Sequence, residues 1–488
     1  MNDVLFHIYS HTGDPNHLAT ARRFNGWVFT APLAAGQDRI TKLPFPHANF
    51  HLPEIIGNAR GFELTSNLTD NQVAKQFFAE ITTNHSYCTG GSNSGECWQE
   101  ARDLGAFLTT QTEESCTQYN ILKIARHLFQ WEADPVLAEY YERAILNGIV
   151  GNQNRLAMGA TSYIYMLPLG GVVTKPWGKS DFGFPCCWGT LSETFSKLSD
   201  SIFFASPAGD TIYVNQFVSA DLTIPNSKAR LHQKSAFPAS EHSTTTLTVS
   251  VPDDTVKLTL RIRVPSWTKA PIIKLNGESL PWSGVVPGRY SVIDRMWKDG
   301  DTVEAYYPMH LWSNPLNDYH PEYNATMAFM YGPLVLAGVY PHSDIFVPKG
   351  DSFQADPASF ITRNSSTALE FEAVAANGTK LKMIALNEVM LEPYVVYFMT
   401  AGTKPPQPKV YYCPHSAKPA PPANPLLERK PLDKKEEEIN EQSLVSAGPP
   451  AAAPVSATFG SASKRGVKWN VVDGIMHPAT LGAAPTEL

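Results

Sequence analysis

Residues 113–129 read EESCTQYNILKIARHLF, and this stretch decides how the first half of the chain folds. After Cys116, apolar residues recur at helical intervals at Leu122, Ala125, Leu128 and Phe129. Residues three or four apart share one face of an α-helix. The stretch therefore predicts an amphipathic helix whose start carries a cysteine and two glutamates.

Other segments of the first half repeat this pattern. Asp14-Pro15 and Asp134-Pro135 each place a capping residue before a first-turn proline, and Asp70 is expected to open a further helix. The apolar stripes are Leu18, Ala21, Trp27 and Val28, then Val73, Phe77 and Ile81, then Leu137, Tyr141, Ala144 and Ile145, and finally Leu191, Phe195, Leu198 and Ile202. Long amphipathic helices joined by long loops favour an α/α toroid over a four-helix bundle.

Near residue 205 the period of the apolar residues changes from 3.6 to 2. Apolar and polar residues alternate from Val256 to Val264, which predicts a strand with one exposed face. Asn276-Gly277 and Asp299-Gly300 are turn dipeptides between further strand-like runs. The second half is therefore expected to be β-sheet.

The composition changes again from about residue 403, where proline, alanine, serine and charged residues dominate. Such a segment has too few apolar residues to offset the chain entropy lost on folding. We therefore expect a multidomain chain, α then β. The predicted parts are a helical domain at 1–205, a β-sandwich domain at 206–345, an additional β-rich segment at 346–414 and a disordered tail at 415–488.

Bulk properties exclude several classes of partner. The 488 residues carry a net charge of −7 with both signs mixed, so no basic surface is available for nucleic acid or an anionic membrane. No apolar run approaches the roughly 20 residues of a spanning helix. Residues 1–15 lack a signal-peptide pattern, whereas the sequons at Asn67, Asn84, Asn324, Asn364 and Asn377 favour secretion of the full-length product. The oligomeric state is left open.

Glu114, Cys116 and the pair Cys186-Cys187 together offer one carboxylate and three thiolates, which is a full tetrahedral set for zinc. Residues i and i+2 share a face only on an extended chain, so the helix is expected to begin at or after Cys116. The adjacent cysteines require a bent backbone, which Pro185 would favour. The alternative is that the pair is merely two small buried apolar residues or a surface accident.

A set of motifs from residue 2 to 340 makes the chain resemble the β-L-arabinofuranosidases of glycoside hydrolase family 127, most closely the plant-type members. The motifs are His51-Leu52-Pro53, Thr89-Gly90-Gly91 leading to Glu96, Glu113 to Thr117, Tyr140 to Ala144, Cys186-Cys187, Arg263 to Trp267 and Tyr331 to Leu334. They follow one another in the family's order. The resemblance implies an (α/α)6 barrel followed by β-sandwich domains.

The resemblance also implies a zinc ion held by Glu114, Cys116, Cys186 and Cys187, with Cys186 as nucleophile, Glu96 as general acid/base and His51 as a sugar contact. The expected reaction is hydrolysis of non-reducing-end β-L-arabinofuranosides with retention, on an arabinose-containing glycan or glycoconjugate. Zinc coordination turns a thiol into a thiolate, which is the nucleophilic form. Taken alone, Glu96 would be a solvated loop residue and His51 a buried structural histidine.

The chain departs from the family at its start, because family members carry several barrel helices before the point that matches residue 2. We therefore expect an N-terminally truncated barrel. Two alternatives stay open: a related glycosidase with another sugar preference, and an inactive, zinc-stabilised carbohydrate-binding homologue. Trp98 and Trp188 border the catalytic segments and either stack on sugar or pack internally. Whether Cys88 and Cys97 pair in a disulfide also stays open.

Overall fold

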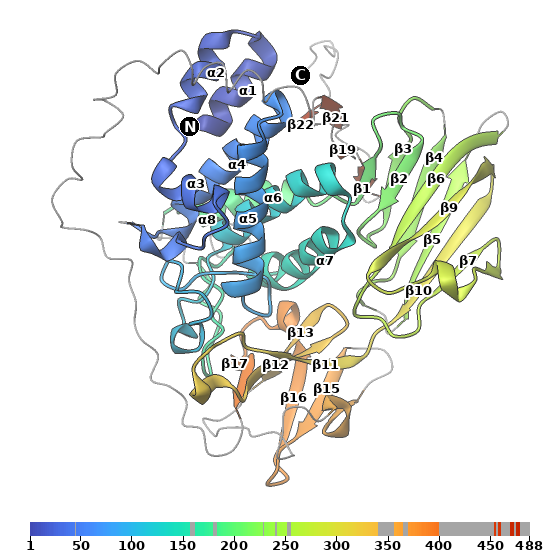
Figure 1. The fold of residues 1–488 in the computed structure, drawn as a ribbon. Helices are drawn as coiled ribbons and strands as arrows, with labels where there is room; N and C mark the ends of the chain where they lie inside the picture. Colours follow the sequence, from blue (N-terminus) through green and yellow to red (C-terminus); the bar gives the residue numbers. More distant parts are fainter. Residues whose placement is uncertain are drawn as a thin grey trace, which may run out of the picture.

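The computed structural model describes residues 1–43, 45–156, 162–178, 183–227, 229–239, 242–250, 255–339, 356–364 and 369–399, together with four short strands between 453 and 478. Helices fill the first part of this chain and sheets the second, as Figure 1 shows. The predicted order of α then β is confirmed. Within the described residues, no helix has the length and apolar character needed to cross a membrane.

The helical domain consists of helices that pack side by side (Figure 1), and the helices from Trp27 onward share one apolar core. They are α1 (Asn2–Thr12), α2 (Pro15–Arg22), α3 (Trp27–Ala34), α4 (Ala48–Thr65), α5 (Leu68–Asn84), α6 (Ser115–Glu132), α7 (Pro135–Ala144) and α8 (Cys186–Ser196). Helix α4 packs against α1, α5 and α6, and α6 packs against α7 and α8. Helix α6 is thus the central element, and its predicted apolar stripe faces the core.

Side-chain caps fix where several of these helices begin. Asp14 and Asp134 each accept a hydrogen bond from the backbone N–H two residues later, which confirms both predicted caps. The helix start predicted at Asp70 is wrong, because α5 begins at Leu68. Asn67 accepts from the N–H groups of Thr69 and Asp70, so the cap lies three residues earlier.

Two sheets of a sandwich follow, and their facing sides share one core. The first contains β1 (Phe203–Ala205), β2 (Thr211–Val214), β6 (Thr255–Val264) and β9 (Arg289–Lys298). The second contains β3 (Ala220–Thr223), β4 (Arg230–Ser235), β5 (His242–Ser250), β10 (Asp301–Pro308), β7 (Ile272–Leu275) and β8 (Glu278–Ser279). Strand β2 pairs with β6 in parallel, and the other pairs within these sheets are antiparallel.

Strand β6 confirms the alternating pattern, because Leu258, Leu260 and Ile262 are buried while Thr259 and Arg261 are partly exposed. Asn276 and Gly277 both have positive φ, 51° and 86°, and form the hairpin between β7 and β8. The turn at 299–300 behaves differently. Strands β9 and β10 on its two sides belong to opposite sheets, so this turn carries the chain across the sandwich.

A third sheet follows the sandwich and crosses the domain boundary predicted at 345. It contains β11 (Leu311–Pro315), β12 (Thr326–Tyr331), β13 (Leu334–Val339), β16 (Lys380–Ala385), β15 (Glu370–Val374) and β14 (Ile361–Arg363), with β17 (Tyr394–Val395) and β18 (Tyr397–Met399) on β13 and β12. The predicted boundary is therefore wrong. The sheets change between Pro308 and Leu311, and the strands after 356 complete a sheet that begins at β11.

The tail predicted at 415–488 lies for the most part outside the described residues. Its described pieces are the short strands β19 (Ala453–Pro454), β20 (Ala457–Phe459), β21 (Trp469–Val472) and β22 (Ile475–Pro478). Strand β19 pairs with β1 and β20 with β3, while β21 and β22 pair with each other.

A buried ion pair ties the helical domain to the sandwich. Arg263 of β6 is fully buried, and its Nη2 lies 2.6 Å from Oε1 of Glu142 on α7. Arg263 Nε also donates to the Asn215 carbonyl, and Trp267 Nε1 donates to the second oxygen of Glu142. Because every partner is buried, losing one of them would leave a charge without compensation.

We expect Arg263→Met to lower the free energy of unfolding by about 3–5 kcal/mol, because Glu142 would stay buried without its cation. Guanidinium denaturation followed by tryptophan fluorescence measures this. The matched control is Lys382→Met, which removes an exposed pair with Glu370 and should cost less than about 1 kcal/mol. Equal losses in the two variants would show that the buried pair contributes no more than a surface pair.

Candidate active site

Three thiols and one carboxylate converge at the start of α6 and α8. The ligand atoms of Glu114, Cys116, Cys186 and Cys187 all lie within 4.8 Å of one another. The sulfurs of Cys116 and Cys187 are 3.3 Å apart, and Cys187 Sγ lies 3.8 Å from Glu114 Oε1. Sequence analysis grouped these four residues, and the structure brings them together.

The starts of two helices position the four side chains. Helix α6 begins at Ser115, one residue earlier than predicted, and Glu114 is its extended N-cap residue with φ −81° and ψ 133°. Cys186 and Cys187 are the first two residues of α8, so the expected bent backbone is a helix start after Pro185. Because successive residues turn by 100° around a helix, Cys187 points into the core and Cys186 stays exposed.

Polar contacts hold the Glu114 carboxylate and backbone in place. Thr117 Oγ1 donates to Glu114 Oε2 at 3.1 Å, and Glu114 N donates to Asn93 Oδ1 at 2.8 Å. The next amide, Ser115 N, donates to the Tyr165 carbonyl at 3.3 Å. These bonds satisfy the first amides of α6, which have no partner inside the helix.

Burial and neighbouring charge separate the acidities of the four groups. Burial is the largest cause that raises the pKa of Glu114, to about 7, and the negative charge of Cys186 adds to it. Hydrogen bonds from Cys116 and Cys187 lower the pKa of Cys186, whereas the pKa values of those two buried thiols are raised. Cys186 is therefore the thiol that ionises first.

The donor set fits zinc. Sulfurs bound to one zinc ion at about 2.3 Å lie about 3.8 Å apart in a tetrahedron, close to the spacing of these donor atoms. Three thiols and one carboxylate are also ligands that favour zinc over magnesium or calcium. Cys116 Sγ has one further neighbour, Thr190 Oγ1 at 3.0 Å on the next turn of α8.

Glu96 reaches the same place from the loop between α5 and α6. Tyr165 OH donates to Glu96 Oε1 at 2.6 Å and lies 3.3 Å from Cys186 Sγ. On the other side, His47 Nε2 lies 3.3 Å from Glu96 Oε2. Tyr165 thus bridges the predicted nucleophile and the predicted acid/base, which come from segments 90 residues apart.

The ion pair with His47 shifts both partners. Its hydrogen bond is the largest cause that lowers the pKa of Glu96 and also the largest that raises the pKa of His47. The negative charge of Cys186 acts in the opposite direction and raises the pKa of Glu96. The protonation of Glu96 therefore depends on whether Cys186 carries a charge.

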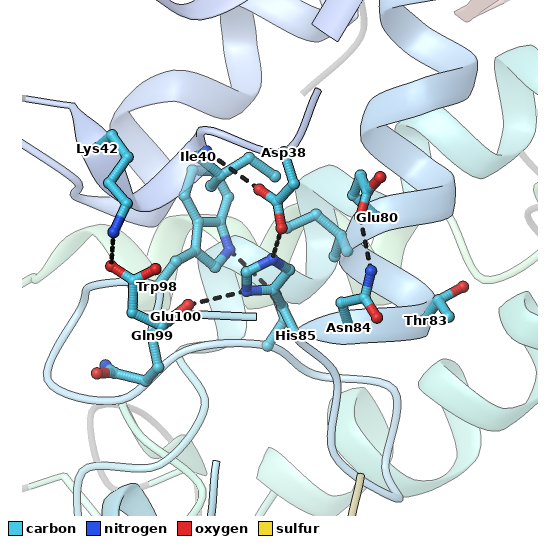
Figure 2. A network of polar contacts seen from close by, with 12 residues as sticks. Asp38, Ile40, Lys42, Glu80, Thr83, Asn84, His85, Trp98, Gln99 and Glu100 are labelled. Carbon is cyan, nitrogen blue, oxygen red and sulfur yellow. Dashed lines mark hydrogen bonds and ion pairs between the residues drawn. The ribbon is translucent and has the colours of Figure 1, made fainter. Parts of the chain in front are cut away.

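A polar network anchors the loop that carries Glu96, as Figure 2 shows. His85 Nδ1 contacts the Gln99 carbonyl at 2.9 Å, and its Nε2 contacts Asp38 at 2.9 Å. Lys42 pairs with Glu100 in the same loop. Glu96 itself has a positive φ of 69°, which the backbone bond from Ala48 N to its carbonyl helps to hold.

The third sheet anchors the loop that carries Tyr165. Val173 exchanges two backbone hydrogen bonds with Tyr394 of β17, at 2.9 and 2.7 Å. Tyr394 OH donates to the Pro168 carbonyl, and Trp177 Nε1 donates to the Met390 carbonyl, both at 2.6 Å. The third sheet thereby fixes a loop of the helical domain.

His51, the predicted sugar contact, lies in α4 and is 9% exposed. Its Nε2 contacts the Phe45 carbonyl at 2.8 Å, its Nδ1 lies 3.8 Å from Glu54, and its ring packs on Phe29. His47, one turn earlier, is the histidine that touches Glu96. A sugar-binding role for His51 stays a prediction.

Trp98 and Trp188, for which the sequence leaves both sugar stacking and internal packing open, are buried. Trp98 packs between Phe29 and Phe77 in the helical core, and Trp188 packs beside Cys116 and Cys187. Their burial therefore supports a role in internal packing. Cys88 is a buried free thiol, so it forms no disulfide with Cys97.

Sequence analysis missed His47, Tyr165 and Thr190. His47 lies four residues before His51, at the start of the same helix. Only its contact with Glu96 distinguishes it from His51. Tyr165 lies in a loop with no periodic pattern. Thr190, three residues after Cys187 on α8, could have been found from helical spacing once the helix was known to begin at Cys186.

Comparison with models of known protein families finds two adjacent matches. Residues 1–200 match the β-L-arabinofuranosidase GH127 catalytic domain, and residues 211–309 match the GH127 middle domain. The two matched segments together span more than half of the chain and follow the boundary between helices and sandwich. Comparison with curated protein sequences returns no match.

Solved structures share the fold. A GH127 β-L-arabinofuranosidase from Geobacillus stearothermophilus T6 aligns with TM-score 0.64 and 19% identity, over 82% of this chain and 71% of its own. A second GH127 β-arabinofuranosidase gives TM-score 0.64 and 19% identity, over 82% and 68%. A glycoside hydrolase gives 0.62 and 16%, over 81% and 74%. With the two family matches, these findings confirm the resemblance read from the motifs: the chain belongs to glycoside hydrolase family 127, the β-L-arabinofuranosidase family.

Proposed function

We propose that this glycoside hydrolase removes non-reducing-end β-L-arabinofuranosyl residues with retention, using Cys186 as nucleophile and Glu96 as general acid/base. The observation that carries the proposal is the position of Tyr165 OH, 2.6 Å from Glu96 and 3.3 Å from Cys186. These contacts keep sulfur and carboxylate oxygen within about 6 Å, closer to the roughly 5–5.5 Å of retaining enzymes than to the 6.5–9.5 Å of inverting ones. The sugar itself is inferred from the family.

Exposure and acidity both favour Cys186 as the nucleophile. It is the exposed member of the four, whereas Cys116 and Cys187 are buried behind it. Its lowered pKa makes it the thiolate, the reactive form of cysteine. Cys186 Sγ attacks the anomeric carbon and the bond to the leaving oxygen breaks, while Glu96 gives its proton to that oxygen.

Glu96 then changes role from acid to base. In the structure Tyr165 donates its one hydroxyl proton to Glu96, which lowers the pKa of that carboxyl group, and this support is lost when the proton turns to the Cys186 thiolate. The charge of that thiolate raises the pKa of Glu96, against the larger lowering by the His47 hydrogen bond. Once Cys186 carries the sugar, its charge is gone and the pKa of Glu96 falls. Glu96 then takes a proton from water, which attacks the anomeric carbon and releases the sulfur.

Glu114, Cys116, Cys186 and Cys187 are the residues that would hold zinc. When bound, zinc keeps its sulfur ligands deprotonated at neutral pH. Asn93, Thr117 and Tyr165 hold the Glu114 segment through the contacts described above, so that its carboxylate faces Cys187. Such outer contacts commonly fix the orientation of metal ligands.

We expect Cys116→Ser to lower zinc affinity by at least about 100-fold, because losing a ligand costs more than the 10–100-fold typical of outer-shell changes. Zinc content after dialysis against a graded chelator, read by mass spectrometry, measures this. Cys88→Ser is the matched control, since Cys88 is also buried and free but lies outside the cluster. If Cys116→Ser kept zinc as tightly as Cys88→Ser, the metal site would be elsewhere.

We expect Glu96→Gln to lower kcat for an alkyl β-L-arabinofuranoside by about 10²–10⁴-fold, and much less for a dinitrophenyl one, because a good leaving group departs without a proton. Zinc content should not change. Cys186→Ser should abolish turnover of both substrates. Steady-state kinetics on the two substrates make the comparison.

Glu100→Gln is the control for Glu96→Gln, because it changes a glutamate of the same loop whose carboxylate pairs with Lys42. It should leave both rates unchanged. An equal loss on the two substrates in Glu96→Gln would show that Glu96 is not the acid that protonates the leaving group.

A further inference from the structure

A cavity of about 620 Å³ lies where the helical domain, the sandwich and the third sheet meet, and it shares no residue with the candidate active site. Figure 1 shows α7 between the sandwich and the third sheet, and this helix forms one wall of the cavity. The other walls are formed by α5, by loops of the sandwich and by the start of the third sheet. A cavity of this volume is within the range of small-ligand sites, about 300–1,000 Å³.

Three nitrogen-bearing side chains line the cavity without a protein partner. Among the described residues, Arg143, Lys269 and His310 make no ion pair, and the buried Arg143 Nε and His310 Nδ1 have no hydrogen-bond partner. Lys269 is exposed at the edge. A buried polar atom without a partner is costly, so Arg143 Nε and His310 Nδ1 are available to a polar group that the protein alone does not supply.

The carboxylates of the cavity are already engaged. Glu142 is bound by Arg263 and by Trp267 Nε1. Glu139 accepts hydrogen bonds from the hydroxyl and the backbone N–H of Ser266. Neither carboxylate forms an ion pair with Arg143 or Lys269 among the described residues, so both cations can pair with an anionic group on a ligand.

The remaining wall is largely aromatic. Trp267 and Trp312 line the cavity with Phe78 and Tyr140, whose rings meet edge to face at 5.1 Å. Aromatic faces bind the C–H faces of sugar rings, and side chains with an apolar body and a polar tip are common at such sites. A small inorganic anion would leave this wall without contacts.

We propose that this cavity is an accessory binding site for an oligosaccharide that carries a carboxylate, that is, one with a uronic acid residue. Arg143 and Lys269 bind the carboxylate, His310 contributes a hydrogen bond, and the aromatic wall holds the sugar rings. The site is independent of the reaction at Cys186, and it gives the enzyme a second contact with an acidic glycan.

Isothermal titration calorimetry of the full chain with an α-1,4-linked digalacturonate tests this. We expect saturable binding, with affinity lowered by about tenfold or more in Arg143→Met and in Lys269→Met, since each loses a charge-assisted contact. Lys234→Met, a lysine exposed on β4 and outside the cavity, should bind as the unaltered protein does. Lys269→Met keeps the test valid if Arg143→Met folds poorly, because Lys269 is exposed.

The neutral disaccharide of the same linkage should bind at least about tenfold more weakly than the digalacturonate, because it lacks the group that Arg143 and Lys269 contact. Inorganic phosphate should not displace the digalacturonate at equal concentration. The proposal is overturned if the unaltered protein does not bind digalacturonate, if Lys269→Met binds it unchanged, or if phosphate or the neutral sugar binds as tightly.

Discussion

The contact between the sulfurs of Cys116 and Cys187, 3.3 Å apart, is the constraint on which the catalytic half of the molecule depends. It lies where the N-termini of α6 and α8 meet, although 70 residues of chain separate the two cysteines. Glu114 then remains extended as the N-cap of α6, and Cys186, first on α8, faces outward. The starts of the two helices thus bring the donor atoms of the four residues together.

The sheet domains contribute to this arrangement through the loops that they hold. Backbone bonds from Tyr394 and the hydroxyl of the same residue fix the loop that carries Tyr165, which in turn touches both Glu96 and Cys186. The buried pair Arg263–Glu142 locks the sandwich against α7. Loops position these catalytic groups only because a rigid scaffold holds both ends. The helical domain therefore carries the proposed reacting groups, and the sheet domains hold the elements that position them.

Sequence reasoning predicted those features that leave a local signal. The stripe of α6, the caps at Asp14 and Asp134, the alternation along β6 and the Glu114–Cys187 donor set all follow from spacing or residue type. The predictions from sequence failed where the arrangement of the strands depends on pairing between distant segments. The turn at 299–300 joins strands of opposite sheets, and the third sheet joins β11 to strands after 356, neither of which the local sequence encodes. His47 and Tyr165 act through contacts across 49 and 69 residues, so they gave no pattern to find.

In the proposed mechanism a sulfur, rather than a carboxylate, attacks the sugar. Peptide mass spectrometry after treatment with a mechanism-based arabinofuranosyl inhibitor tests this most directly. We expect one covalent adduct, on Cys186, which disappears in Cys186→Ser. An adduct on Glu96 or Glu114 with Cys186 unmodified would contradict it, because the nucleophile would then be a carboxylate and the thiols would serve only to bind metal.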